Sequence, residues 1–233
     1  MRMRHVLTGA GSGIGLALAH HLADRGDHLV LVARSQARAD DLRATFANAQ
    51  VLVADLADPG TLNGLGRQVD GGVDTLLHVA GVVELAPVER LRLADWEEQI
   101  AVNLTAPAVL SRELLPQLRA SGGTVVFVNS SAGLTASAEW SAYAASKFGL
   151  RAFADALRAE EVEHGVRVST VYPSRTATPM QEKVHEQEGR TYDSSRWIST
   201  RTVVETIVHV IDLPGDATIP EVTVRPLVPR PGT

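Results

Sequence analysis

The chain reads Thr8-Gly9-Ala10-Gly11-Ser12-Gly13-Ile14-Gly15 between a short apolar run and the helical pattern Ile14–Arg25. Glycines lack a Cβ atom, so the backbone here can turn sharply and a pyrophosphate can approach the main-chain amides. The helix that follows adds unpaired N–H groups and a partial positive charge. Such a turn can also serve packing alone, but a strand before it and a helix after it favour a dinucleotide site. The residues expected to contact the cofactor are Gly9, Ser12, Gly13 and Ile14.

Short apolar runs alternate with longer amphipathic stretches from this turn to the end of the chain. The predicted strands are His5–Leu7, His28–Val32, Gln50–Ala54, Val73–Val79, Thr124–Asn129, Val166–Tyr172 and Glu221–Val224. The predicted helices are Ile14–Arg25, Ala37–Ala47, Trp96–Arg119, Ala142–His164 and Thr202–Leu213. Continuous apolar strands separated by helices are typical of a parallel sheet covered on both faces, and right-handed crossovers make it doubly wound. No repeat or linker divides the chain, so we expect one α/β domain over residues 1–233.

Two segments interrupt this alternation. Residues 181–199 are polar, charged and aperiodic, and they follow the sixth predicted strand. A long irregular segment inside a compact domain is usually functional or disordered, so we expect a substrate loop that closes as a lid. The alternative is an exposed connector with no part in binding. Residues 226–233 hold three prolines and are predicted to be a surface tail.

The second predicted strand ends Leu31-Val32-Ala33-Arg34-Ser35. An NAD(H) site places Asp or Glu there to bind the ribose 2′-hydroxyl. Arg34 instead offers a fixed cation that suits a 2′-phosphate. An exposed Arg at a helix start is a common alternative, but the missing carboxylate and the added cation together favour NADP(H) over NAD(H). Asp55, followed by Leu56 after the third predicted strand, either binds the adenine amino group or simply ends the strand.

A second group of candidates begins a helical stretch that reads Tyr143-Ala144-Ala145-Ser146-Lys147. Four residues turn a helix by about 400°, so Tyr143 and Lys147 project from one face. A phenol with its ordinary pKa of about 10 is a poor base at neutral pH. Because a nearby ammonium lowers a phenol pKa, we expect Lys147 to lower that of Tyr143 and make it a general acid/base.

Ser130 lies thirteen residues before Tyr143, at the carboxyl end of the fifth predicted strand. Ligands of open α/β sheets bind beyond the carboxyl ends of the strands, so Ser130 is predicted to share a crevice with the glycine turn. There its hydroxyl would hold the substrate oxygen. Ser131 is the rival, because neighbouring residues on a strand face opposite ways. The spacing to Gly133 and Tyr143 favours Ser130.

In their order and spacing these motifs resemble those of the short-chain dehydrogenase/reductases. The matching residues are Thr8-Gly9…Gly13-Ile14-Gly15, Asn103-Leu104, Ser130, Tyr143…Lys147 and Pro173…Thr178. The resemblance implies a Rossmann domain with a mainly parallel seven-stranded sheet in three αβα layers. It also implies hydride transfer between a nicotinamide cofactor and a carbonyl or a secondary alcohol.

The resemblance further implies roles for single residues. Tyr143 would be the acid/base, Lys147 would bond the ribose hydroxyls and Ser130 would orient the substrate oxygen. Asn103, in the bend of a helix, would hold a water in a proton relay to Lys147. Further cofactor contacts would come from Ala80, Gly81, Pro173, Thr176 and Thr178.

The chain departs from the family pattern after two strands. The family's Asn-Asn-Ala-Gly is His78-Val79-Ala80-Gly81 here, and the apolar Val79 cannot form the hydrogen bonds of the second Asn. His78 in an apolar strand is predicted to be a buried structural histidine rather than a catalyst. The family's Pro-Gly is Pro173-Ser174, which leaves the backbone slightly less free to approach the nicotinamide. Neither change touches the proton-transfer groups.

Composition excludes several classes of function. The net charge of −5 argues against nucleic-acid binding. The chain has no cysteine, which excludes thiolate chemistry and suits a reducing cytoplasm. His20-His21 has no second ligand pair nearby, so no metal is expected. No apolar window approaches the roughly 18 residues of a membrane span. We therefore expect a soluble cytoplasmic protein without a secretory leader, bound to no membrane and acting on a small molecule.

Two rival functions and an assembly remain open from the sequence alone. A redox sensor would need only the dinucleotide cleft, and a lyase like the halohydrin dehalogenases would use Arg in place of Lys147. The four catalytic candidates and the intact glycine turn favour the oxidoreductase. Two predicted helices, Trp96–Arg119 and Ala142–His164, carry more apolar residues than one sheet contact needs, which predicts a homodimer or homotetramer. These apolar residues are Leu104, Val109, Leu114, Leu118, Phe148, Leu150, Phe153 and Leu157.

Overall fold

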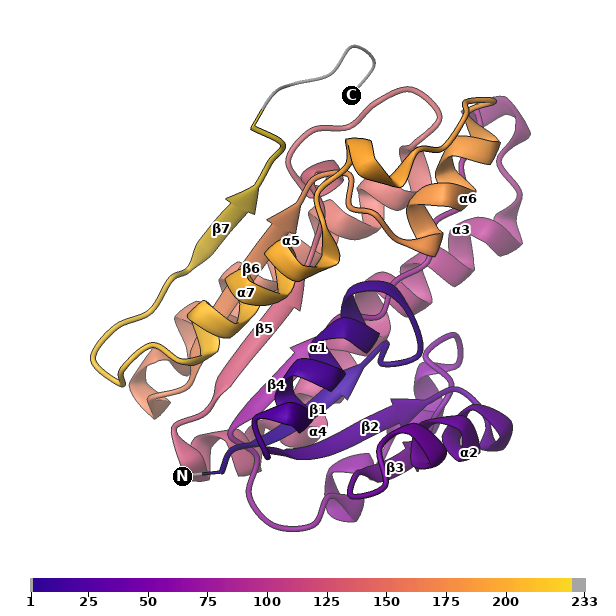
Figure 1. The fold of residues 1–233 in the computed structure, drawn as a ribbon. Helices are drawn as coiled ribbons and strands as arrows, with labels where there is room; N and C mark the ends of the chain where they lie inside the picture. Colours follow the sequence, from indigo (N-terminus) through magenta and orange to yellow (C-terminus); the bar gives the residue numbers. More distant parts are fainter. Residues whose placement is uncertain (1, 228–233) are drawn as a thin grey trace.

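A computed structural model of the chain describes residues 2–227. Within this range seven strands form one sheet in the order β3-β2-β1-β4-β5-β6-β7, and all neighbours run parallel (Figure 1). The strands are β1 (Arg4–Thr8), β2 (His28–Ala33), β3 (Gln50–Val53), β4 (Thr75–His78), β5 (Thr124–Val128), β6 (Arg167–Pro173) and β7 (Glu221–Val224). The strand order reverses between β1 and β4, as in a doubly wound fold, and such a switch point opens a crevice at the carboxyl ends.

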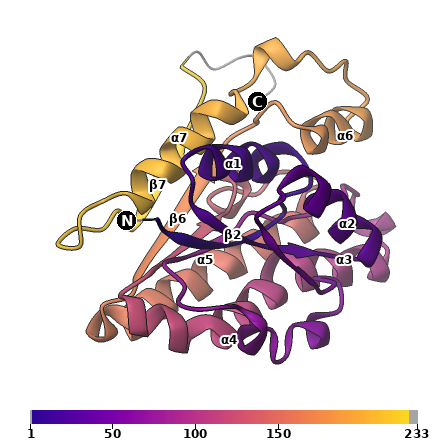
Figure 2. The ribbon, with the colours of Figure 1, turned by 60° about the horizontal axis from the view of Figure 1, so that its bottom comes forward.

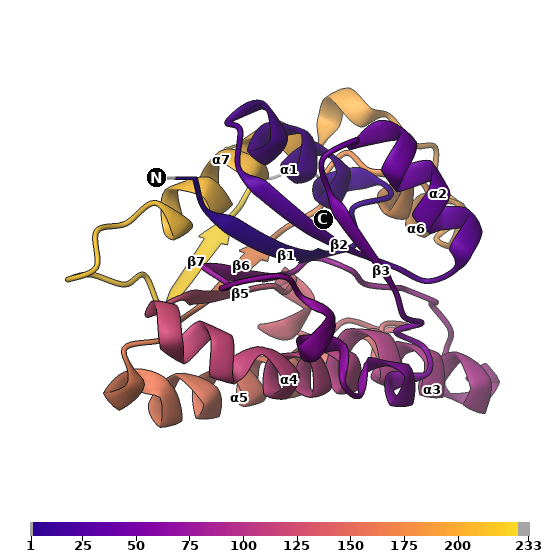
Figure 3. The same cartoon turned by 90° about the horizontal axis from the view of Figure 1, so that it is seen from below.

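Helices cover both faces of this sheet (Figure 3). One layer contains α1 (Gly13–Asp24), α2 (Gln36–Thr45) and α7 (Thr200–Ile211), and α1 packs beside α7 (Figure 2). The other layer contains α3 (Leu93–Ile100), α4 (Ala106–Ser121) and α5 (Ser141–Glu161). Successive strand residues face opposite ways, so Leu7 joins the first apolar core and Val6 the second. The predicted three-layer Rossmann fold is confirmed.

The predicted helix Trp96–Arg119 is broken in the middle. A wider π-helical turn, Ala101–Thr105, separates α3 from α4. Single π turns of this kind bend a helix and often mark functional sites. Asn103 lies inside the turn and is only 1% exposed, at the place where the resemblance puts the bend of a helix.

The prediction that residues 181–199 are irregular is wrong for their first half. Here α6 (Pro179–Gln187) begins at Thr178, whose hydroxyl accepts a hydrogen bond from the Gln181 amide over 3.2 Å. Pro in the first turn also favours a helix start. The rings of Tyr192 and Trp197 lie 5.3 and 5.1 Å from the His185 ring. Aromatic packing around a buried histidine therefore orders a segment that has little periodic apolar sequence.

The ends of that segment are joined by main-chain pairing. Thr176 and Ile198 form a parallel bridge, and the Ala177 amide donates to the Ile198 carbonyl over 2.8 Å. Residues 179–197 thus leave and return at one point beside β6. Of the predicted tail, residues 228–233 lie outside the described residues, and Leu227 is exposed.

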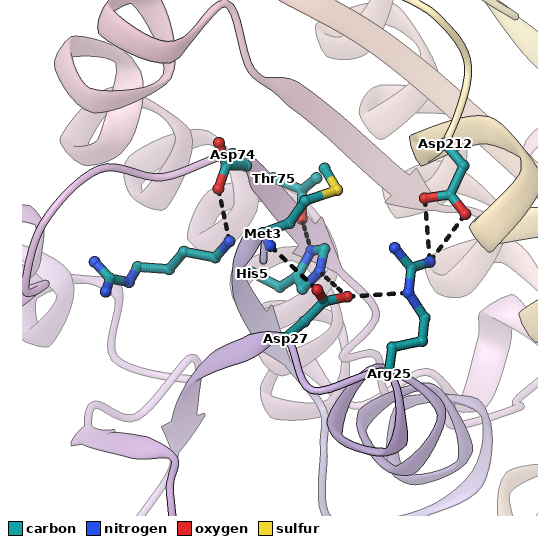
Figure 4. Close-up of polar contacts among 8 residues, drawn as sticks. Met3, His5, Arg25, Asp27, Asp74, Thr75 and Asp212 are labelled. Carbon is teal, nitrogen blue, oxygen red and sulfur yellow. Dashed lines mark hydrogen bonds and ion pairs between the residues drawn. The ribbon is translucent and has the colours of Figure 1, made fainter. Parts of the chain in front are cut away.

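A polar network lies at the amino-terminal ends of the strands, opposite the carboxyl ends where the crevice opens (Figure 4). The buried His5 ring contacts the Thr75 hydroxyl at 2.6 Å and the Asp27 carboxylate at 3.2 Å. Arg25 pairs with Asp27 at 3.1 Å and with Asp212 at 2.9 Å. The network joins β1 and β4 to the ends of α1 and α7. Burial lowers the pKa of His5, although the Asp27 hydrogen bond opposes this shift.

Candidate active site

A cleft of about 940 Å³ lies over the switch point, lined by the segments that follow β1 to β6. The predicted site residues that line it are Gly9, Ser12, Gly13, Ile14, Arg34, Asp55, Leu56, Ala80, Gly81, Ser130, Tyr143, Lys147, Pro173, Thr176 and Thr178. Asn103 is the exception, because it is buried behind this surface. Residues from six separate segments thus meet in one cavity.

The glycine turn has the geometry of an anion cradle. Gly9 has a φ of +81°, and a Cβ there would lie 2.7 Å from the Ala80 amide nitrogen. Gly13 has a φ of +54° and lies against Thr178. Ser12 precedes α1 but makes no side-chain cap, so the first amides of α1 remain open to a ligand. The turn therefore fits the pyrophosphate of a dinucleotide.

Arginines occupy the far end of the cleft. Arg34 is exposed and lines the cavity directly after β2. Arg38 lines it one helical turn later, donates to the Gly11 carbonyl over 3.2 Å and pairs with Asp41 at 2.9 Å. Sequence reasoning missed Arg38, although its spacing of four from Arg34 on a helix start was the available signal. Both arginines therefore line the part of the cleft that follows β2.

Asp55 and Leu56 line the same end of the cleft. The exposed Asp55 carboxylate accepts a hydrogen bond from the Ala57 amide over 3.0 Å, which turns the chain after β3. This hydrogen bond supports the strand-ending interpretation of Asp55. Because Asp55 also lines the cleft, the predicted contact of Asp55 with adenine stays a proposal.

Tyr143 and Lys147 project from α5 into the middle of the cleft. The two side chains are buried, and Lys147 Nζ lies 5.7 Å from the centre of the Tyr143 ring. Lys147 Nζ also donates to the Val128 carbonyl over 3.2 Å. Ser130 follows β5 and shares a hydrogen bond with Tyr143. The three predicted catalytic side chains therefore converge.

The predicted lowering of the Tyr143 pKa is wrong for this structure. Burial raises the pKa of Tyr143 to about 12, and the Ser130 hydrogen bond opposes this shift only in part. Burial also lowers the pKa of Lys147 to about 8. Desolvation disfavours the charged form of each group and outweighs any attraction between them. At neutral pH Tyr143 is thus protonated, which is the form that can donate a proton.

Asn129 is a site residue that the sequence analysis missed. Its side chain is buried, its Oδ1 accepts from the Ser130 amide over 2.8 Å and its Nδ2 donates to the Lys147 carbonyl over 3.0 Å. A Cβ on Gly133 would lie 2.5 Å from Asn129 Oδ1. No periodic signal marks such a residue, since its role comes from a contact across two elements.

Asn103 joins the end of β4 to the catalytic helix. Its side chain exchanges two hydrogen bonds of 2.9 Å with the Val82 backbone and donates to Ser146 Oγ over 3.0 Å. Ser146 Oγ in turn donates to the Tyr143 carbonyl over 2.7 Å. Both N–H donors of the side chain are thus used in fixing the site, and the predicted water contact stays a proposal.

His78 is the buried structural histidine that the sequence predicts. Its Nε2 lies 3.0 Å from Ser111 Oγ, and its ring stacks on Phe127 at 4.8 Å. Burial lowers the pKa of His78 to about 3, so the ring is neutral. At Val79 the main-chain amide donates to Thr8 Oγ1 over 3.2 Å. This backbone hydrogen bond holds the segment after β4 to β1, although the Val79 side chain itself forms none.

α6 forms the outer wall of the cleft. Val184 packs in an apolar cluster with Val83, Ala132 and Tyr143. Lys183 pairs with Glu84 at 2.7 Å, and Gln187 donates to the same carboxylate over 2.5 Å. These interactions bring the segment after β6 onto the segment after β4.

The described part of the chain offers neither a metal cluster nor a membrane span. Among residues 2–227 no group of three or more His, Cys, Asp or Glu side chains is placed to hold a metal ion. No helix in that range is long and apolar enough to cross a membrane.

A model of the family described as short chain dehydrogenase matches residues 4–189, which include the glycine turn, Ser130, Tyr143 and Lys147. This protein is a short-chain dehydrogenase. It is thus an oxidoreductase that acts on alcohol or carbonyl groups.

Named relatives of this short-chain dehydrogenase act on different molecules. It is 33% identical over 186 residues to D-threitol dehydrogenase of Mycolicibacterium smegmatis, covering 76% of this chain and 72% of the relative. It is 32% identical over 232 residues to D-beta-hydroxybutyrate dehydrogenase of Rhizobium meliloti, covering 94% and 86%.

Solved structures of similar proteins contain nicotinamide dinucleotides. A putative NAD(P) dependent gluconate 5-dehydrogenase from Beutenbergia cavernae, with bound NADP, has a TM-score of 0.83 and 29% identity over 95% of this chain and 94% of its own. A 4-hydroxyisoleucine dehydrogenase complexed with NADH has a TM-score of 0.83 and 26% identity over 96% and 97%. This short-chain dehydrogenase therefore uses a nicotinamide dinucleotide.

Proposed function

We propose that this short-chain dehydrogenase transfers hydride between NADP(H) and a carbonyl or secondary alcohol, with Ser130, Tyr143 and Lys147 as its catalytic residues. The observation that carries the proposal is the convergence of these side chains in the cleft that begins at the glycine turn. The nicotinamide, when bound, supplies or accepts the hydride.

In the reducing direction Tyr143 donates the proton. Its raised pKa keeps the phenol protonated at neutral pH, and the Ser130 hydroxyl holds the substrate oxygen beside it. Lys147 would stabilise the phenolate that remains and bond the ribose hydroxyls. As the family resemblance implies, Asn103 would hold a water near Lys147. A proton relay through this water would return a proton to Tyr143.

The preference for NADP(H) over NAD(H) rests on charge at the adenosine end. Arg34 and Arg38 line that end, and the second predicted strand ends without a carboxylate. A guanidinium matches the geometry of a phosphate and keeps its charge at any physiological pH. The relatives with solved structures bind either NADP or NADH, so the choice depends on these residues.

α6 and the segment that follows it act as a lid over the substrate. The Thr176–Ile198 bridge gives residues 179–197 a shared hinge, and Glu84 latches the lid through Lys183 and Gln187. The proposed lid is therefore a folded segment that begins with α6, not the irregular loop that the sequence predicts. Its interior packing on His185 favours motion as one unit.

The proposed assembly is a homodimer or homotetramer. Four of the eight apolar residues named for it, Leu114, Leu118, Leu150 and Leu157, pack inside the chain instead. Of the remaining four, Phe148 on α5 is 42% exposed and the other three are partly exposed. Leu104, Val109 and Phe153 complete this outer face.

The cytoplasm is the proposed location, since the chain has no cysteine.

Absorbance at 340 nm tests the function directly with NADPH, NADH and a panel of aldehydes, ketones and oxo acids. We expect carbonyl-dependent oxidation of NADPH, faster than of NADH. Tight NADPH binding without turnover of any carbonyl would instead support the redox sensor. Halide release from a halohydrin without cofactor would support the lyase.

A further inference from the structure

Arg175 occupies an unusual position at the substrate end of the cleft. It lies two residues after the end of β6, lines the cavity, and its side chain is 16% exposed. The guanidinium carbon lies 5.8 Å from the centre of the Trp140 ring and 5.6 Å from that of Trp197. Trp140 in turn contacts the Tyr143 ring at 5.7 Å. The Trp140 ring therefore lies between the Arg175 guanidinium and Tyr143, the proposed proton donor.

Glu188 holds the end of this guanidinium. Arg175 Nη1 donates to Glu188 Oε2 over 2.8 Å and Nη2 donates to Oε1 over 2.5 Å. This pairing uses the terminal nitrogens, and among residues 2–227 the Nε–H has no hydrogen-bond acceptor. A second carboxylate can approach a guanidinium along its Nε–Nη edge, since the group has five donors in one plane.

Two arginines approach the Glu188 carboxylate. Arg190 also approaches Glu188, at 3.7 Å, so that guanidinium groups from two residues share one carboxylate. All three residues line the cleft. Glu139 lines it as well, but that side chain is exposed to solvent, where water and salt screen its charge. The guanidinium groups of Arg175 and Arg190 and the Glu188 carboxylate thus lie together in the cleft wall, and Arg175 is the less exposed of the two arginines.

A purely structural role would explain only part of this arrangement. The ion pair does tie the loop after β6 to the end of α6. Such a tie needs neither a place in the cleft wall nor indoles near the guanidinium, which hold it in a defined plane. A fixed planar cation beside a reaction centre is suited to the recognition of a carboxylate.

We propose that Arg175 binds a carboxylate of the substrate along its Nε edge, so that the substrate is a hydroxy acid or the corresponding oxo acid. Glu188 keeps the guanidinium in position. The proposal rests on the proposed function and narrows it to one class of substrate.

Binding can be measured without turnover. Trp140 and Trp197 flank Arg175, so their fluorescence should report a ligand there. We expect butyrate to bind the NADP⁺ complex at least about ten times more tightly than butyramide. In the paired variant Arg175→Met/Glu188→Gln, which removes both charges, this difference should disappear. Similar dissociation constants for the two probes in the wild-type protein would overturn the proposal.

Kinetics provide the second arm, with 3-oxobutyrate and its methyl ester as a matched pair. Arg175→Met/Glu188→Gln should raise KM for the acid by about ten- to a hundred-fold and leave KM for the ester nearly unchanged. Glu188→Gln alone should lower KM for the acid, because it removes a competing negative charge. Equal effects on acid and ester would overturn the inference and leave the proposed function intact. Absence of turnover of both the acid and the ester by the wild-type enzyme would count against the proposed function instead.

Discussion

The side chain of Asn129 donates a hydrogen bond of 3.0 Å to the main-chain carbonyl of Lys147, and so connects the end of β5 to the catalytic helix. Its other end accepts from the Ser130 amide. One amide thereby fixes the separation of two proposed catalytic residues through their main chains.

The first prediction follows from this hydrogen bond. Asn129→Ala should lower kcat by about ten-fold, since two hydrogen bonds of about 1 kcal/mol each hold the geometry. KM for NADPH should stay near the wild-type value, and Asn129→Ser should recover part of kcat. The pH dependence of kcat should also shift, because Lys147 is less well placed. An unchanged kcat and pH profile in a variant that only melts at a lower temperature would contradict the positioning role.

The second prediction concerns the choice of cofactor. Arg34→Ala should weaken NADPH binding by about ten- to a hundred-fold and change NADH binding little, because the variant cannot form a charge-assisted hydrogen bond to the 2′-phosphate. Arg38→Ala should act in the same direction. Titration of intrinsic fluorescence with each cofactor measures both effects. Arg43→Ala is the matched control, since Arg43 lies on the same helix away from the cleft. Equally weakened binding of NADPH and NADH would contradict the assignment.

The third prediction concerns stability at acid pH. His78 has a pKa of about 3 in the folded protein against 6.5 in the unfolded chain, so the unfolded state takes up the proton first. Stability should therefore fall as the pH drops from 6.5 toward 3, and His78 should account for about 2 kcal/mol of this fall by pH 5. His78→Asn should reduce the fall. His5 acts with the same sign and should leave part of it.

Urea unfolding at pH 7.5 and pH 5 measures this difference. The comparison uses the change with pH, so any weaker packing in His78→Asn cancels. His209→Asn, at an exposed position on α7, should behave like the wild-type protein. A pH dependence that His78→Asn leaves unchanged would contradict the buried-histidine interpretation.

The sequence was sufficient for the sheet because its signals are local. Seven apolar runs matched the strands within a few residues, and Glu221–Val224 matched β7 without a shift. The glycine turn, Ser130 and the Tyr143–Lys147 pair were found through spacing along one element or one turn. Such spacing predicts which residues lie on the same helix face and which lie at the same edge of the sheet.

Features that depend on contacts between distant segments were not predictable. α6 lacks an apolar period, and its order comes from Tyr192 and Trp197 packing on His185. The roles of Asn129 and Arg175 depend on partners 18 and 13 residues away. The Tyr143 pKa was misjudged for a related reason, because a helical spacing gives no measure of burial.

The fourth prediction concerns the lid. Glu84→Gln should weaken the latch to Lys183 and Gln187, so hydrogen exchange of residues 183–193 should become faster. NADPH together with a substrate should slow this exchange in the wild-type protein. Glu97→Gln, at an exposed position on α3, is the control. Exchange that is the same with and without ligands would contradict the lid and support a fixed wall.

The most direct test of the central claim is the rate of NADPH oxidation by Tyr143→Phe in a single turnover with a carbonyl that the wild-type enzyme reduces. The variant lacks only the phenolic oxygen, so it should bind NADPH within about two-fold of wild type and react about a hundred- to ten-thousand-fold more slowly. Normal binding with this slower rate would place the proton transfer at Tyr143. A rate within about ten-fold of the wild type, at normal NADPH occupancy, would contradict the proposed chemistry.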